Sequence, residues 1–481
     1  MRSLDPASDN PGRSRFRQLD DVFRYWQDLA PSQREQLCRQ AEDVDPELLQ
    51  RLFHQAESPE GCYLPAAEAI RPAAVAPLAD SERSRSEEAR AARRGRRALQ
   101  AGQVAVVLVA GGQGTRLGHD GPKGTFPIGP VSGKSLFQIH AEKALAISRR
   151  YRTPLPLYVM TSPDNDDATR EFFAENDFFG LKRDQVVFFR QGMMPALDRK
   201  TGQLLMADKH RLAMSPNGHG GVVQALADGG HLADLRRRGA EYIFYYQVDN
   251  PLVKVADPAF LGLHVEADAE MSLKVVRKLN AQEKMGVVVE VGGRLQIIEY
   301  SDLPREIAER CLPDGSLEIW AGSIAVHVFN LSFLEALASD ESKLPYHRAL
   351  KKVPYLDDRG KLVQPAEPNA IKFERFIFDA LPMARNALAV ETHRREEFEP
   401  LKNADGANSP ASVRQAMSSL FAGWLGSIEA AAAGRRNGSA HVAIEISPLL
   451  ALDAKELQER LSWRGPIEKP LLLDEHMAVA S

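Results

Sequence analysis

An apolar run that passes directly into a glycine-rich loop constrains this chain more than any other feature. Residues 104–110 read VAVVLVA, and residues 111–118 read GGQGTRLG. A short β-branched run is typical of a strand buried on both faces of a parallel sheet, although periodicity alone leaves a buried helix open. The glycines decide for the strand, because they allow the sharp turn and close backbone approach of a ligand-binding loop.

Two cations accompany this loop, Arg116 and Lys123. A planar guanidinium and a mobile ammonium beside bare backbone N–H groups suit a polyphosphate. The alternative is a plain tight turn with a solvated arginine. Because the glycines and both cations coincide, we interpret the stretch as a phosphate-binding loop.

Two common nucleotide loops are excluded by their spacing. The dinucleotide fingerprint Gly-x-Gly-x-x-Gly fails at its third glycine, where Leu117 stands. A Walker loop is suggested by GKS at 133–135, but Ile128 occupies the place of its first glycine. We therefore expect a nucleotide loop of another kind.

Three consecutive motifs, GGQGTRLG, GPKGTFPIG and KSLFQIHAEK, carry a resemblance to a known family. Together they resemble the UDP-N-acetylhexosamine pyrophosphorylases, uridylyltransferases of the UDPGP type 1 family, over residues 104–405. The resemblance implies an α/β fold of the Rossmann-like nucleotidyltransferase (glycosyltransferase-A-like) type, with a mixed, mostly parallel sheet and helices on both faces. It also implies that Gly111, Gly112 and Gly114 hold the nucleotide, and that Arg116 and Lys123 contact its phosphates.

Length and composition set wider limits. The chain has 481 residues, 26% of them charged, and a formal net charge of -4. This balance indicates neither a nucleic-acid partner nor an anionic membrane. The three cysteines, Cys38, Cys62 and Cys311, are too scattered for a disulfide framework. With no apolar signal segment and no membrane-spanning run, a soluble cytoplasmic protein of two or three domains is expected.

The chain divides into three parts by pattern. Residues 1–100 form an N-terminal helical region and linker, with Pro31 and Pro46 as helix boundaries and an Arg-, Glu- and Ala-rich helix over 81–100 whose face is expected to be solvated. Residues 101–395 form the catalytic domain. Residues 396–481 form a small C-terminal α+β domain, with a helix over 412–433 and a strand over 441–446.

Within the catalytic part, a helix is expected over 135–150 and further strands over 155–160, 186–189 and 242–248. Strand, helix and strand at this spacing imply right-handed parallel units, whose ligands lie at the carboxyl ends of the strands. Thr161 and Ser162 follow one such end. They either contact substrate or cap the helix that begins near Asp166.

Two loops carry candidates for the base and the sugar. Gln191 offers the donor and acceptor that a pyrimidine edge requires, and the resemblance of QGMMPA implies that it reads uracil; otherwise it is a surface residue. Residues 215–222, SPNGHGGV, are expected to be loop, with Gly218 allowing close approach to the nucleotide. His219 departs from the resemblance, since acetylhexosamine enzymes carry Asn near the acetyl group there and UDP-glucose pyrophosphorylases carry Pro-Gly-His-Gly.

Asp249 follows the strand over 242–248 and precedes Asn250-Pro251. A carboxylate at the end of a buried strand can hold Mg2+ on triphosphate oxygens, and it can equally form a turn before proline. The resemblance of YYQVDNPLVKVADP implies that Asp249 is the metal ligand. We therefore predict Mg2+ as the cofactor.

The remaining candidates concern the sugar 1-phosphate. A hairpin over 286–300 turns at Gly292-Gly293, and the resemblance implies that Gly286 and Glu299 lie at the sugar. Ser323 stands where relatives have Asn. Phe376 and Phe378 belong to NAIKFERFIFD, which resembles the sugar-side stretch, although such aromatics are more often core. The resemblance of FEPLKNAD implies that Lys402 reaches the sugar phosphate.

These parts predict an enzyme that forms a UDP-sugar and pyrophosphate from UTP and a sugar 1-phosphate. The sugar phosphate is already a nucleophile, so direct in-line attack on the α-phosphorus needs positioning and charge neutralisation rather than a catalytic triad. N-acetylglucosamine 1-phosphate is the predicted substrate. The alternatives are glucose 1-phosphate, favoured by His219 and Ser323, and a non-catalytic UDP-sugar-binding regulator.

Overall fold

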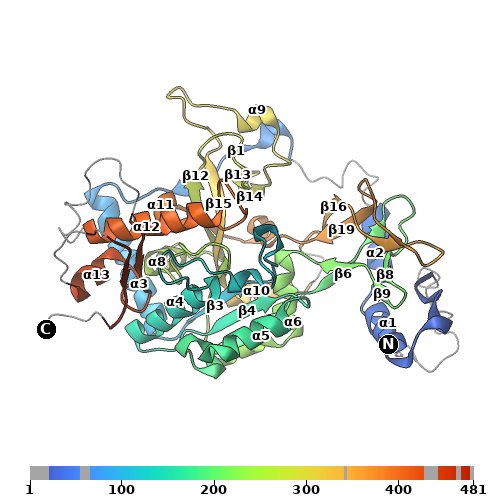
Figure 1. Cartoon of the computed structure of the whole chain (residues 1–481). Helices are drawn as coiled ribbons and strands as arrows, with labels where there is room; N and C mark the ends of the chain where they lie inside the picture. The colour runs from blue at the N-terminus through green and yellow to red at the C-terminus, as the bar shows by residue number, and fades with distance from the viewer. Residues whose placement is uncertain are drawn as a thin grey trace. The chain divides into compact units, whose positions relative to one another are not determined.

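The computed structural model describes residues 21–54, 65–340, 344–426, 442–461, 467 and 469–476, which fall into two compact units (Figure 1). The larger unit comprises Ala66–Arg190, Val223–Glu341 and Ala380–Ser481. The smaller unit comprises Met1–Pro65, Gln191–Val222 and Ser342–Asp379. Both units are therefore assembled from segments that are distant in sequence. The predicted domain boundaries at residues 100 and 395 stay predictions.

A large mixed sheet forms the centre of the larger unit, in the order β2-β20-β12-β15-β11-β3-β4-β5. All neighbours along this path are parallel except the two pairs that involve β15, so the predicted mixed, mostly parallel sheet is confirmed. The strands are β2 Val75–Ala76, β3 Val104–Val109, β4 Leu157–Thr161, β5 Val186–Arg190, β11 Tyr242–Gln247, β12 Met271–Arg277, β15 Ala321–Asn330 and β20 Ala387–Glu391.

The predicted first strand is β3, and its residues 104–108 are at most 1% exposed. Helix α4, Leu136–Tyr151, follows the glycine loop. Ser135 caps it by accepting a hydrogen bond from the Gln138 backbone N–H, and its apolar positions join the core of the sheet. The predicted helix between the first two strands is thus confirmed.

A hairpin extends the sheet beside β15. Strands β13, Val287–Val291, and β14, Arg294–Ile298, pair antiparallel, and β1, Arg71–Pro72, pairs with β13. Gly292 and Gly293 both have positive φ, 58° and 77°, as a two-residue hairpin turn of this hand requires. This confirms the predicted hairpin.

The C-terminal segment shares the core of the sheet. It consists of α12 Pro410–Gly426, β21 Ile444–Ile446, α13 Ala454–Arg460 and β22 Leu471–Leu473. Apolar residues of all four elements belong to the same hydrophobic cluster as β3 and α4. The end of the predicted helix, 427–433, and residue 441 of the predicted strand lie outside the described residues.

Helix α3, Glu82–Gln100, has exposed charged side chains, as expected, and in addition a narrow buried face that was not predicted. Ala91 and Ala98 are buried, and α3 packs on α8, Pro258–Glu266. A Cβ at Gly262 would lie 1.7 Å from the Ala91 carbonyl oxygen, so the helix backbones touch. The charge pattern did not reveal this contact, because small residues let two helix backbones pack closely while the charged side chains stay exposed.

The smaller unit combines the N-terminal helices with two inserted segments. Helices α1, Pro31–Glu42, and α2, Pro46–His54, begin at the predicted prolines, and they share a hydrophobic cluster with residues 194–212 and 356–373. Its strands are β6 Met193–Pro195, β7 Leu197–Asp198, β8 Met206–Asp208, β9 Arg211–Leu212, β10 Met214–Pro216, β16 His347–Lys351, β17 Tyr355–Leu356, β18 Leu362–Val363 and β19 Ala370–Glu374.

Short helices complete the description. They are α5 Asp166–Glu175, α6 Val222–Asp228, α7 His231–Arg237, α9 Arg305–Ala308, α10 Leu331–Ala338 and α11 Arg394–Glu397. The 3-10 turns that matter below are η7 Thr115–Leu117, η8 Lys123–Thr125, η11 His219–Gly221 and η12 Ile377–Met383. None of the helices in the described ranges has the length and apolarity that a membrane crossing demands.

Candidate active site

The glycine loop is closed by its own backbone at the carboxyl end of β3. The Lys123 N–H donates to the Gly112 carbonyl (3.0 Å), and the Gly114 N–H donates to the Gly121 carbonyl (2.9 Å). A Cβ at Gly114 would lie 2.8 Å from His119, whereas one at Gly112 would meet nothing within 4 Å. Gly114 is therefore needed for packing, while Gly112 leaves open space above the backbone, as close approach of a ligand requires.

Asn165 fastens this loop to the sheet, a role that the sequence did not reveal. Its side-chain amide donates to the carbonyls of Ala110 (2.9 Å) and Gly112 (3.2 Å). Thr161 is fully buried and donates to Asp166 (2.6 Å), and the Ser162 carbonyl accepts from the Asp166 N–H (2.9 Å). Asn165 is the N-cap residue of α5, and no side chain caps this helix, so the structure decides for neither interpretation of Thr161 and Ser162.

Lys123 and Asp249 come together at the mouth of the loop. The Nζ atom of Lys123 lies 3.7 Å from Oδ2 of Asp249, and the two side chains are 18% and 14% exposed. Asp249 follows β11, the strand that pairs directly with β3. Arg116 lies in η7, is exposed, and precedes Gly118 with its positive φ of 65°. Two of the predicted charged groups, Lys123 and Asp249, thus form a pair before any ligand is considered.

The Asp249-Asn250 dipeptide also holds the segment that leads to Lys402. The Leu401 N–H donates to the Asp249 carbonyl (2.8 Å), and the Asn250 side-chain amide donates to the Glu397 carbonyl (2.7 Å). Asn250 is 3% exposed. Lys402 itself is exposed, and its N–H donates to the Asn408 carbonyl (2.8 Å). Lys402 therefore follows directly in the chain after a residue, Leu401, whose backbone is hydrogen-bonded to Asp249.

Behind this dipeptide lies a buried ionic network. The Lys274 ammonium is 2.7 Å from both Asp257 and Glu397, and Lys274 is 2% exposed. Burial opposes the charge of Lys274, but the two carboxylates raise its pKa. Burial would likewise raise the pKa of Asp257, but Lys274 and Lys254 bring it below its usual value. Every charge here is paired, so the network supports Glu397 structurally.

The three sugar candidates of the larger unit also meet. The Ser323 N–H donates to the Gly286 carbonyl (2.9 Å), and a Cβ at Gly286 would lie 3.1 Å from Oε1 of Glu299. The same Cβ would lie 2.8 Å from Cγ2 of Ile297, so a side chain at position 286 would crowd both Ile297 and Glu299. The hairpin and β15 thus bring together a carboxylate, a hydroxyl and a backbone without a side chain. Such groups can form hydrogen bonds with a polyhydroxylated ligand.

In the smaller unit, Gly218, His219, Phe376 and Phe378 form one cluster. The imidazole of His219 is stacked on Phe376, with centroids 5.4 Å apart and planes at 29°, and Phe378 lies 5.0 Å from Phe376. The Ile377 N–H donates to Nδ1 of His219 (3.3 Å). A Cβ at Gly218 would lie 2.4 Å from the Arg375 carbonyl, so the glycine is required by packing against the chain.

Burial, with the nearby charge of His347 as a second cause, lowers the pKa of His219 to about 4. The imidazole is therefore neutral at pH 7. His347 is itself held by Asp379, with Nε2 2.8 Å from Oδ2.

Three further features of this unit differ from or add to the sequence predictions. Residues 214–216 form β10, which pairs with β6, so the segment expected to be all loop starts as a strand. Gln191 is buried, at 7% exposure. Asn217 was missed: its N–H donates to the Gly192 carbonyl (3.0 Å), and its carbonyl accepts from the Arg375 N–H (2.7 Å). In the sequence, only its position between a proline and a glycine could have indicated that Asn217 has such a role.

Asp249 is the predicted ligand of a metal ion. In the described part of the chain, no three His, Cys, Asp or Glu side chains gather where they could hold a metal ion. Mg2+ is, however, usually bound by one or two carboxylates together with substrate phosphates and water. The single half-buried carboxylate of Asp249 beside a phosphate-type loop fits that manner of binding.

Comparisons with known proteins agree with this geometry. The family model described as UTP–glucose-1-phosphate uridylyltransferase matches residues 55–431. A UDP-N-acetylhexosamine pyrophosphorylase-like protein 1 of Xenopus tropicalis is 40% identical over 86% of this chain and 84% of its own length. A UDP-N-acetylglucosamine pyrophosphorylase of Saccharomyces cerevisiae is 39% identical over 76% of this chain and 78% of its own.

A solved structure is also similar. The crystal structure of the uridine diphosphate N-acetylglucosamine pyrophosphorylase from Trypanosoma brucei superposes with a TM-score of 0.78 at 28% identity, covering 92% of this chain and 91% of that one. The matched family model spans most of the chain, including the glycine loop, Lys123 and Asp249. The chain therefore belongs to the UTP–glucose-1-phosphate uridylyltransferase family and is a nucleotidyltransferase.

Proposed function

We propose that this enzyme transfers the uridylyl group of UTP to N-acetylglucosamine 1-phosphate, forming UDP-N-acetylglucosamine and pyrophosphate. The observation that carries the proposal is the pair of Lys123 and Asp249, 3.7 Å apart beside the glycine loop, with the Lys402 segment bonded to the Asp249 carbonyl. The curated relatives named for the N-acetylated sugar support this choice of sugar.

In the proposed reaction a phosphate oxygen of the sugar 1-phosphate attacks the α-phosphorus of UTP, and the bond to the pyrophosphate oxygen breaks. Both reactants are anions, so the enzyme must hold them together and offset their repulsion. Arg116 and Lys123 are assigned to the triphosphate and Lys402 to the sugar phosphate. These cations, already in position, stabilise the charge that builds up on the leaving pyrophosphate.

Mg2+ is proposed as the cofactor, with Asp249 as its protein ligand and phosphate oxygens as the others. When bound, it would neutralise charge on the triphosphate. Lys123 lies beside the same carboxylate. Without the metal ion, the ammonium of Lys123 therefore balances the charge of Asp249. No second protein ligand is proposed.

Recognition of base and sugar is assigned to separate groups. In the smaller unit, Gln191 is proposed to bind the uracil edge, Gly218 to approach the nucleotide, and His219, Phe376 and Phe378 to face the sugar. In the larger unit, Gly286, Glu299 and Ser323 are proposed to contact the sugar. Gly286 is bonded to Ser323 and lies beside Glu299, which supports a shared role.

A second candidate substrate is glucose 1-phosphate. It is favoured by His219 and Ser323, which replace the asparagines expected for an acetylated sugar. A neutral imidazole, with a pKa of about 4, offers a bulkier group than an asparagine amide. The two candidates share the reaction and differ only in the sugar.

The test is pyrophosphate release by the purified protein with UTP and Mg2+. Three acceptors are compared at equal concentration: N-acetylglucosamine, N-acetylgalactosamine and glucose 1-phosphates. We expect the first to give the highest kcat/KM. Preference for glucose 1-phosphate would contradict the proposed sugar and support the second candidate. UTP binding without release from any acceptor would instead support a non-catalytic UDP-sugar-binding regulator.

A further inference from the structure

We infer that Lys143, together with His140, is a positioning residue that fixes the Asp249 loop from the side of helix α4. The inference depends on the proposed function, in which Asp249 acts at the triphosphate. The Asp249 loop is defined here as residues 248–253. It connects the end of β11 to the segment that continues toward α8.

Two side chains on one face of α4 bond three carbonyls of this loop. The Nζ atom of Lys143 donates to the carbonyls of Pro251 (2.5 Å) and Val253 (2.7 Å). One turn earlier, Nε2 of His140 lies 3.0 Å from the carbonyl of Val248. Residues three apart on a helix share a face, so α4 holds the loop at the residue before Asp249 and at the second and fourth residues after it.

The chemistry of both groups suits this task. A carbonyl can only accept, so Nε2 of His140 must carry the proton. Burial, and next the charge of Lys143, lower the pKa of His140 to about 3, so the ring stays neutral. Burial lowers the pKa of Lys143 to about 7, against the opposing effect of Glu397. Since amine and ammonium both have at least two N–H groups, Lys143 can serve both carbonyls in either form.

The loop needs these donors because the sheet has ended. Strand β11 stops at Gln247, so the carbonyls of Pro251 and Val253 have no partner strand. On its other side, the loop is held by Asn250, which bonds the Glu397 carbonyl, and by the Leu401 N–H. At its start the loop is also held by the Val248 N–H, which donates to the Val109 carbonyl (3.0 Å). Without the Lys143 bonds, however, the residues after Asp249 would be held only through Asn250 and the Leu401 N–H. Asp249 could then shift while the fold remains.

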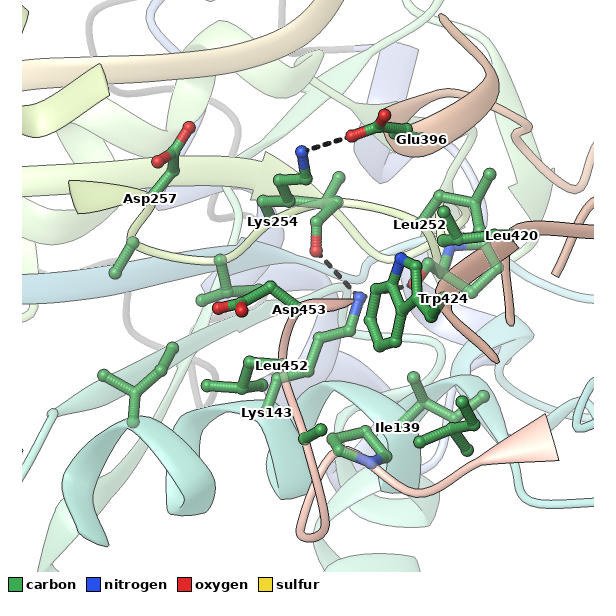
Figure 2. A pocket seen from close by; sticks show the side chains of 18 of the residues that line it. Ile139, Lys143, Leu252, Lys254, Asp257, Glu396, Leu420, Trp424, Leu452 and Asp453 are labelled. Atoms are coloured by element: carbon green, nitrogen blue, oxygen red, sulfur yellow. Dashed lines mark hydrogen bonds and ion pairs between the residues drawn. The ribbon is translucent and has the colours of Figure 1, made fainter. Parts of the chain in front are cut away.

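Figure 2 shows the surroundings of Lys143. It rises from α4 to the main chain of the loop, whereas Lys254, on the continuing segment, turns away to pair with Glu396 (2.7 Å). The lysine borders a cavity of about 250 Å³ in the larger unit, whose apolar walls include Ile139, Leu252, Leu420 and Trp424. Because the cavity has open volume, the larger side chain of arginine can be accommodated at position 143. Close packing of the neighbouring side chains would not replace the hydrogen bonds lost with the lysine.

The experiment compares Lys143→Met with Lys143→Arg. Methionine keeps an apolar stem of similar length and removes the donors, whereas arginine keeps donors. The matched control is Arg149→Met, which removes a cation from an exposed position of the same helix. Hydrogen exchange of peptides covering 248–253 is measured in metal-free protein, and kcat and KM for UTP are measured with Mg2+.

We expect Lys143→Met to accelerate exchange over 248–253 and to lower kcat on the order of 100-fold, with KM for UTP unchanged, because a displaced catalytic group costs about that much. Lys143→Arg should restore most of kcat, and Arg149→Met should match wild type in both measurements. A wild-type kcat in Lys143→Met would overturn the inference. If Lys143→Met does not fold, Lys143→Gln replaces it, because the stem of glutamine is too short to span both carbonyls. A wild-type kcat in Lys143→Gln would then overturn the inference.

The two proposals fail in different ways. If wild type releases no pyrophosphate with any sugar 1-phosphate, the proposed function fails, and the exchange measurement still decides whether Lys143 holds the loop. If wild type is active and the exchange over 248–253 is the same in Lys143→Met, the positioning role fails alone.

Discussion

At the scale of single residues, the pair of Lys123 and Asp249 concentrates the proposed chemistry. Neither group is fully exposed, and each lies at the end or beginning of a short turn that the backbone holds in place. Asp249 is well placed for a cation on the triphosphate, and Lys123 for the phosphates themselves. Because their charges are opposite, the two groups hold each other in position before a negatively charged ligand binds.

The residue-scale prediction is that Lys123→Met lowers kcat by about 10²- to 10³-fold, because one donor fixed at the developing charge is worth that factor. Pyrophosphate release measures kcat, and thermal unfolding checks that the fold is intact. Lys182→Met, which removes an exposed lysine of the same unit, is the control and should match wild type. Near-normal turnover in Lys123→Met would refute the role of Lys123.

At the scale of elements, the contact between α3 and α8 shows how small residues build the larger unit. The backbone of each helix fills the place of the other's missing side chain: a Cβ at Gly95 would lie 2.0 Å from the Pro258 carbonyl oxygen, and one at Gly262 would lie 1.7 Å from that of Ala91. Helix α8 leads on to β12 and Lys274, which supports Glu397 behind the candidate site.

We therefore expect Gly262→Ala to reduce the free energy of unfolding by about 3 kcal/mol or more, because the added methyl must push two helix backbones apart. The control is Gly423→Ala in α12, where a Cβ meets nothing within 4 Å and the helix gains about 0.5–1 kcal/mol. Denaturant unfolding of both variants measures the difference. Equal stability of the two would show that the helices can separate at no cost.

At the scale of the whole molecule, three buried histidines link stability to pH. Burial lowers the pKa of His140 to about 3 and those of His219 and His264 to about 4. In the unfolded chain each titrates near its usual value of about 6.5. Above pH 7 neither state binds these protons, whereas between pH 6.5 and 4 the unfolded state binds more of them.

The free energy of unfolding should therefore fall as the pH is lowered from 6.5 to 4, by up to about 1.4 kcal/mol per pH unit for each histidine. Thermal unfolding between pH 7.5 and 4.5 measures this. His264→Gln cannot bind the proton and should lose less of its unfolding temperature on acidification than wild type. His476→Gln, at an exposed position, should behave as wild type. Equal losses in all three would mean that His264 does not contribute.

Much of the local structure could be predicted from the chain alone. The strand at 104–109, the helix after Ser135 and the hairpin around Gly292-Gly293 depend on side-chain patterning, capping and positive φ, which act between near neighbours. The motifs around Lys123 and Asp249 could be singled out for the same reason. Their roles stay predictions until the variants are measured.

Local side-chain patterns thus specify which segments form strands and turns and which of them carry phosphate-type chemistry. The folded chain is needed to bring Lys123 to Asp249 and to let Asn165 and Asn250 fasten the two loops. It is also needed to form the core that the N-terminal helices share with residues 194–212 and 356–373. These contacts join residues far apart in the chain. A local pattern does not encode them, because they depend on which surfaces become buried together once the sheet has formed.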